Sequence, residues 1–156
     1  MMAPDVTNSY GGDGGVQEFK ETWSLNRGPK SPIWDELRQA MALGCARDRL
    51  YASMPYLFLR VKEDDDAYAA YVAIGADIVV RAAPTSGARK LSKLNWDIVF
   101  RIGDEPPESV GWLKIKTPAG KIGFVQRTLL RSPVDYRIIM ESVRGKWLIT
   151  NFVAGD

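Results

Sequence analysis

Between residues 78 and 153, short apolar segments recur about every ten residues, with Gly- and Pro-containing turns between them. The segment 112–116 alternates apolar and polar side chains, as a half-buried strand does. Near the end of the chain, the dipeptide Arg144-Gly145 separates two strand-like segments and predicts a hairpin. Many short strands at such spacing predict a small β-barrel. The expected strands are 78–81, 96–102, 112–116, 122–125, 135–143 and 146–153.

The N-terminal part has a different pattern. Apolar residues three and four apart predict a short helix over 16–23 and a longer one over 32–43, with Ser31 as its N-cap and Gly44 ending it. Residues 54–61 are predicted to be extended, and 66–74 to be a helical turn running into a strand. Residues 1–15 are rich in Gly and small polar residues and predict a disordered leader.

These patterns predict an α+β fold. Residues 16–75 are expected to form an N-terminal helical extension packed on the barrel, and residues 76–156 a small β-barrel with a C-terminal β-hairpin. The extension has roughly 60 ordered residues, which bury too little area to fold alone. We therefore expect one compact unit.

The composition excludes several kinds of chemistry. Among 156 residues there is no histidine and one cysteine, Cys45. This removes Ser-His and Cys-His nucleophile pairs, an internal disulfide and a thiolate zinc site. The acidic run 63–66 lacks the glycine and spaced oxygens of a calcium loop. No spacing indicates a catalytic carboxylate pair, so we expect no enzyme activity, no metal and no cofactor, and we expect Cys45 to be buried as a small apolar residue.

Charge is distributed unevenly along the chain. Residues 1–78 carry 8 basic and 12 acidic side chains, and residues 79–156 carry 13 and 7, which gives the formal net charge of +2. Basic and aromatic residues alternate over 89–101, a pattern that suits nucleic acid, but the small total charge disfavours such a partner. We expect no membrane span, and the N-terminal residues do not form a signal peptide.

Residues 76–132 resemble the bacterial SH3-like domain. The similarity is carried by the segments 79–84, Leu94, 111–115, 120–125 and Leu129-Leu130, in the family's order and spacing. The chain departs from the family pattern at Phe124, where Trp or Tyr is usual, and in the long loop 103–111. The resemblance implies a barrel of five or six strands that often binds peptidoglycan or other envelope ligands. Fold alone does not transfer chemistry.

A wider resemblance covers residues 16–156. The segments 31–37, 42–44, 54–56 and 147–156 are similar to bacterial proteins that carry an SH3-like domain with N- and C-terminal extensions. Those proteins are commonly described as exported and have no established activity. The resemblance implies a periplasmic or cell-envelope location.

Exposed aromatic rings beside a mobile loop are a common way for a small barrel to bind an extended ligand. The alternative is that each ring belongs to a core or hairpin and that Arg81 supports the loop after it. We expect a binding module for a peptide or cell-wall fragment, acting through the loop 82–92. A protein-interaction or inhibitor module within an envelope complex, or a homodimer, is the alternative. The candidate ligand-binding residues are Arg81, Trp96, Arg101, Trp112 and Tyr136, with Trp147 as a further aromatic.

Overall fold

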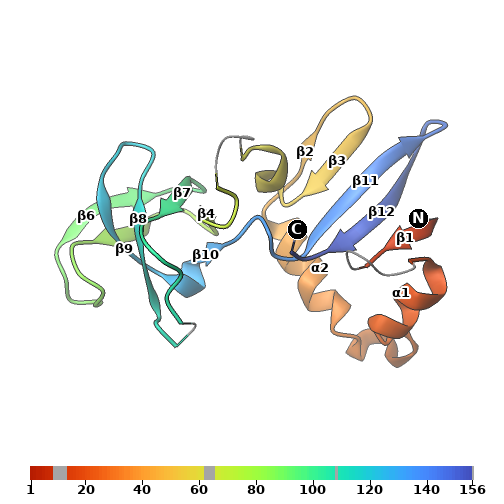
Figure 1. The fold of residues 1–156 in the computed structure, drawn as a ribbon, viewed down its shortest axis with the longest axis horizontal. Helices are drawn as coiled ribbons and strands as arrows, with labels where there is room; N and C mark the ends of the chain where they lie inside the picture. The colour runs from red at the N-terminus through yellow and green to blue at the C-terminus, as the bar shows by residue number, and fades with distance from the viewer. Residues whose placement is uncertain (9–13, 62–65, 108, 156) are drawn as a thin grey trace. The chain divides into compact units, whose positions relative to one another are not determined.

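A computed structural model describes residues 1–8, 14–61, 66–107 and 109–155 (Figure 1). The chain divides into two compact units. The terminal unit comprises residues 1–62 and 134–156, and the inserted unit comprises residues 63–133. Each unit has its own β-sheet and its own apolar core. Strands predominate over helices, which is compatible with the predicted α+β class.

This division differs from the predicted one. The boundary was expected near residue 75, with everything after it in the barrel, but residues 134–156 belong with the N-terminal part. The physical reason is strand pairing, because the C-terminal hairpin forms hydrogen bonds with strands from the first 54 residues. Two separate cores also replace the single compact unit that we expected.

Both predicted helices are present in the terminal unit. The N-cap of the second helix is Pro32 and not Ser31 as predicted. The Ser31 hydroxyl still accepts a hydrogen bond from the Ile33 N–H at 3.3 Å and donates one to the Trp23 carbonyl. The second helix ends at Ala42, and Gly44 just beyond its C-cap has a φ of +69° and donates its N–H to the Met41 carbonyl. The helices of this unit are α1 (Val16–Thr22), α2 (Ile33–Ala42) and the 3₁₀ segments η1 (Leu25–Lys30) and η2 (Tyr56–Leu59). The segment η2 lies where we predicted extended chain over 54–61.

The terminal sheet has the strand order β1-β12-β11-β3-β2. The predicted hairpin forms at Arg144-Gly145, where both residues have positive φ, as a tight hairpin turn requires. Its assignment to the barrel is wrong, because β11 pairs with β3 and β12 pairs with β1. The strands are β1 (Met2–Thr7), β2 (Ala46–Arg47), β3 (Tyr51–Met54), β11 (Arg137–Val143) and β12 (Lys146–Val153).

The prediction of a disordered leader is wrong for residues 2–7, which form strand β1. Residues 2–7 pair in parallel with β12, and Ala3 and Val6 are buried. The burial of these two side chains offsets the entropy of ordering the segment. Residues 9–13 of the predicted leader lie outside the described residues.

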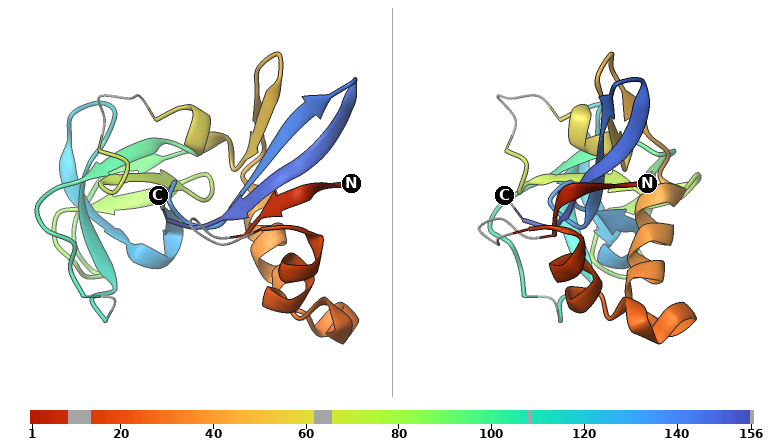
Figure 2. Two further views of the ribbon diagram at one scale, coloured as in Figure 1. Left: turned by 45° about the vertical axis from the view of Figure 1, so that its right-hand side comes forward. Right: turned by 90° about the vertical axis from the view of Figure 1, so that its right-hand side faces the viewer.

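Helices α1 and α2 pack against the terminal sheet and close its core (Figure 2). Trp23 is central to this core. Its ring centroid lies 5.0 Å from that of Phe152 and 4.9 Å from that of Tyr136, the latter edge-on. Such aromatic pairs add to the stabilisation that burial alone gives.

The inserted unit holds one antiparallel sheet with the strand order β10-β4-β7-β8-β9-β5-β6. The strands predicted over 78–81, 96–102, 112–116 and 122–125 are all present. No pairing among the described residues joins β6 to β10, so the ladder does not close into a barrel. The elements are β4 (Ala70–Ala73), β5 (Ile78–Arg81), β6 (Lys90–Leu94), β7 (Ile98–Arg101), β8 (Trp112–Lys116), β9 (Ile122–Gln126), η3 (Arg127–Leu129) and β10 (Leu130–Arg131).

The inserted core is mainly aliphatic, and Tyr71 of β4 also belongs to it. The inward-facing residues of β5, β7, β8 and β9 are buried, as the period of two predicts. Gly123 of β9 stands where β5 and β9 approach each other. A Cβ atom at this position would lie 2.7 Å from the Arg81 carbonyl oxygen and 2.6 Å from a Val80 methyl group. The close approach therefore requires glycine at 123.

Candidate functional site

A groove in the inserted unit brings together two of the predicted ligand-binding residues, Arg81 and Trp112. We call it the Arg81–Trp112 groove. Its volume is 270 Å³, and its lining combines polar and apolar side chains. The lining residues are Ala76, Asp77, Ile78, Val79, Arg81, Ser86, Trp112, Gln126 and Leu129.

Arg81 ends strand β5 at a point where the β5–β6 register shifts. Such irregularities re-aim a side chain relative to a regular strand. One guanidinium nitrogen, Nη1, donates to the Ala88 carbonyl at 2.9 Å. Arg81 therefore supports the loop 82–88, as the alternative interpretation held, while its side chain also lines the groove.

Trp112 begins strand β8 and is half-buried. It is paired across the ladder with Gln126 of β9, so the two residues are cross-strand neighbours. The groove thus has one wall built from β8 and β9 and another built from β5 and the turn before it.

Trp96 does not line this groove. The residue sits in the turn between β6 and β7 with a φ of +59°, and its backbone N–H donates to the Gly75 carbonyl. Its side chain is 45% exposed. This location makes Trp96 a matched control for Trp112.

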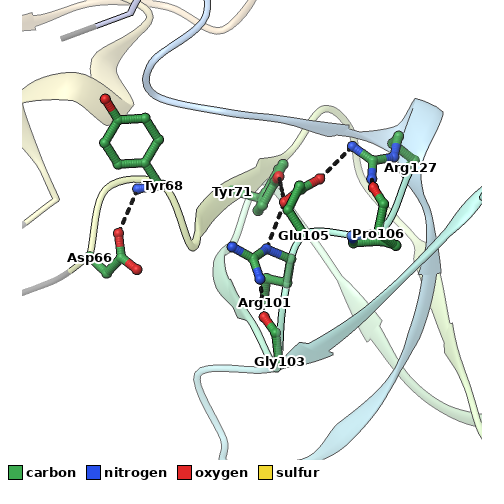
Figure 3. Close-up of polar contacts among 8 residues, drawn as sticks. All are labelled: Asp66, Tyr68, Tyr71, Arg101, Gly103, Glu105, Pro106 and Arg127. Atoms are coloured by element: carbon green, nitrogen blue, oxygen red, sulfur yellow. Dashed lines mark hydrogen bonds and ion pairs between the residues drawn. The ribbon is translucent and has the colours of Figure 1, made fainter. Parts of the chain in front are cut away.

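Arg101 is also outside the groove and belongs to a polar cluster around Glu105 (Figure 3). Its Nε lies 2.7 Å from Glu105 Oε2, and Arg127 Nη1 lies 2.7 Å from Glu105 Oε1. The Tyr71 hydroxyl donates to Glu105 Oε2 at 2.9 Å. Glu105 is the point toward which all three side chains are directed in Figure 3. Arg101 was predicted to contact an anionic ligand, and the structure pairs its guanidinium with Glu105 of the same chain.

The cluster shifts two pKa values. Burial raises the pKa of the Tyr71 hydroxyl above its ordinary 10.0, and the hydrogen bond to the Glu105 carboxylate adds to that effect. Partial burial acts to raise the pKa of Glu105. Hydrogen bonds from Arg127 and Tyr71 and the charges of the two arginines outweigh it, so the pKa lies below its ordinary 4.5. The carboxylate is therefore held ionised.

The cluster also holds two described points of the loop before β8, Pro106 and Gly111. Arg127 Nη2 donates to the Pro106 carbonyl at 2.9 Å, and the Arg127 backbone N–H donates to the Gly111 carbonyl at 2.9 Å. Because Gly111 directly precedes Trp112, Arg127 holds the chain at the start of a groove wall. Sequence reasoning missed this arrangement. The spacing of Arg101 and Glu105 is visible locally, but Tyr71 and Arg127 reach Glu105 only through the sheet pairing.

The remaining aromatic candidates lie in the terminal unit. Tyr136 is half-buried and packs against Trp23 and Phe152, its ring stacked 5.3 Å from the Phe152 ring. Trp147 of β12 is half-buried and faces the Arg47 guanidinium at 4.9 Å. Both belong to a different unit from Arg81 and Trp112.

Other features bear on chemistry within the described part of the chain. No three Asp, Glu, His or Cys side chains gather there as metal ligands do, and residues 63–65 of the acidic run lie outside it. None of the helices described has the length and apolar character needed to cross a membrane. Cys45 is exposed, which corrects its expected burial. It directly follows Gly44, where the chain leaves α2.

Comparisons with known protein families, with curated proteins and with solved structures found no match to this chain. The resemblance to the SH3-like domain therefore stays a prediction from the sequence, and the site is interpreted from its own geometry.

Proposed function

We propose that the chain is a non-enzymatic binding module of the bacterial cell envelope. In this proposal the inserted unit is an SH3-like domain that recognises a short peptide or a peptidoglycan-type fragment in the Arg81–Trp112 groove. The segments that carry the resemblance fall on β5, β6, β8, β9 and β10. The envelope assignment rests on that resemblance.

The observation that carries the proposal is that Arg81 and Trp112 line one groove together with Ser86 of the loop 82–88. An indole ring stacks on a peptide or sugar face with little loss of side-chain entropy. A guanidinium group binds carboxylates, which peptide stems carry. Ser86 and Gln126 add hydrogen-bonding groups at the same groove. This mixture suits a polar chain with short side groups.

The test is co-sedimentation of the purified protein with insoluble peptidoglycan sacculi at 0.05 M and 0.3 M salt. The variants are Trp112→Leu in the groove, Gln126→Ala at its exposed rim and Trp96→Leu outside it. Circular dichroism of each variant checks that the sheet is intact. We expect salt-resistant binding that Trp112→Leu weakens about tenfold, as loss of a central aromatic contact does. Trp96→Leu should bind as the wild type does.

Two outcomes contradict the proposal. Binding that disappears at 0.3 M salt would be non-specific attraction to the basic residues, since charges beyond roughly 6 Å are then screened. No binding at either salt would remove the cell-wall ligand and favour a protein partner instead.

A further inference from the structure

The terminal unit contains a second, chemically different space. A pocket of 130 Å³ lies between its helices and its sheet. The described residues that form its wall contribute apolar surface only, with Leu25 on the helical side and Ile138 and Ile149 on the sheet side. Apolar cavities of roughly 150 Å³ in other proteins stay dry and take up benzene or xenon. A pocket of this size and lining suits hydrocarbon.

An apolar groove runs along the outer side of α2. Trp34, Arg38 and Met41 succeed one another on this side at helical spacing, and Gly28 and Pro29 of η1 also line the groove. Trp34 is 45% exposed and Met41 is 57% exposed. Together with Leu37 they give the groove its apolar surface.

Pocket and groove share a wall. Trp34 and Leu37 line both of them. The Trp34 indole N–H donates to the Gly28 carbonyl at 2.8 Å, which holds the ring at this boundary. A ligand that occupies both spaces must be slender, flexible and apolar along its length. A hydrocarbon chain has these properties, whereas a folded partner surface can cover the groove but not extend through the pocket.

We propose that the terminal unit binds a single acyl chain. The end of the chain lies in the pocket behind Trp34 and Leu37, and the remainder lies along α2. Arg38 is at the groove, in an exposed ion pair with Asp35 at 2.5 Å. Exposed pairs of this kind contribute little stability, so the guanidinium can turn to an anionic head group. This site is separate from the Arg81–Trp112 groove in residues and in ligand class.

The test is isothermal titration of the full chain with sodium laurate below its micelle concentration, with benzene as a probe for the pocket alone. Ile149→Phe fills the pocket, and Met41→Ser makes the groove polar at an exposed position. Ile122→Ser removes an equally exposed apolar side chain from the inserted unit and is the control. We expect saturable 1:1 binding of laurate, weakened about tenfold by each of the first two variants and unchanged by the control.

Benzene distinguishes binding in the pocket from binding in the groove. It should shift the methyl NMR signals of Ile138 and Ile149 in the wild type and in Met41→Ser, and not those of Ile138 in Ile149→Phe. If Ile149→Phe does not fold, the Met41→Ser titration still decides the question. Absence of saturable laurate binding, or equal laurate affinity in Met41→Ser and Ile122→Ser, overturns the proposal. Dodecyl maltoside in place of laurate measures how much of the binding affinity the anionic head group contributes.

Discussion

Arg127 Nη1 lies 2.7 Å from Glu105 Oε1, and this ion pair joins η3 to a loop more than 20 residues earlier in the chain. Arg101 approaches the other carboxylate oxygen, so the single negative charge of Glu105 is shared between the guanidinium groups of Arg101 and Arg127. The backbone of Arg127 also holds Gly111, the residue before Trp112. The polar cluster thus positions one wall of the Arg81–Trp112 groove without itself lining that groove.

Glu105→Gln should destabilise the inserted unit by about 1–2 kcal/mol, because it leaves the largely buried Arg101 side chain without its counter-charge. Amide hydrogen exchange in β7 and β8 measures this local free energy. Asp77→Asn is the control, since its pair with Lys93 is well exposed. That variant should change stability by less than about 0.5 kcal/mol. Equal effects of the two substitutions would contradict the assigned role of Glu105.

The stability that Glu105 contributes should depend on pH. Its pKa in the folded chain lies below the ordinary 4.5, so the contribution is complete well above pH 4.5 and is lost as pH falls through the folded value. The difference in unfolding free energy between wild type and Glu105→Gln should therefore shrink on acidification. Urea titrations of both proteins between pH 7 and pH 3 measure it. A difference that stays constant or grows in acid would show that the carboxylate is not stabilised as an ion.

Gly123→Ala should destabilise the inserted unit by about 1–3 kcal/mol, because the added methyl group meets the Arg81 carbonyl and Val80 across the sheet. Gly111→Ala is the matched control, since a Cβ atom there has nothing within 4 Å. Thermal unfolding followed by circular dichroism compares the two variants. If both behave alike, β5 and β9 do not approach as closely as described.

Val6→Ala should lower the stability of the terminal unit by about 1–3 kcal/mol, because Val6 is fully buried in the core beside Phe19. Asp5→Ala alters the neighbouring, exposed residue and should have little effect. Amide exchange in β12, the parallel partner of β1, provides the measurement. Unchanged β12 protection in Val6→Ala would mean that residues 2–7 do not add to the sheet.

The elements that the sequence predicted best have local signals. The helix over 32–43 is signalled by Ser31, Pro32 and Gly44, and the hairpin by Arg144-Gly145. Each of these residues lies at or next to the end of the element that it signals. The pairing of β1 with β12 has no such signal, because Val6 and Ala3 become core residues only when a strand from the other end of the chain lies beside them.

The same distinction applies to the site. Arg81 and Trp112 were predicted from motif and pattern, and the structure places both at one groove. Tyr136 belongs to the same pattern of aromatic residues, but strand pairing places it in the terminal core beside Trp23. The role of Glu105 could not be predicted from its loop sequence, because its three partners come from β4, β7 and η3 and meet it only in the folded sheet.

We propose that the Arg81–Trp112 groove binds a peptide-type ligand, and an NMR titration of the ¹⁵N-labelled chain with a soluble muropeptide tests this most directly. Binding in the groove should give saturable shifts at the Trp112 indole N–H, the Arg81 and Ser86 amides and Gln126, with the Trp96 indole unmoved. Shifts spread evenly over both units, or none at the Trp112 indole at millimolar ligand, would contradict it.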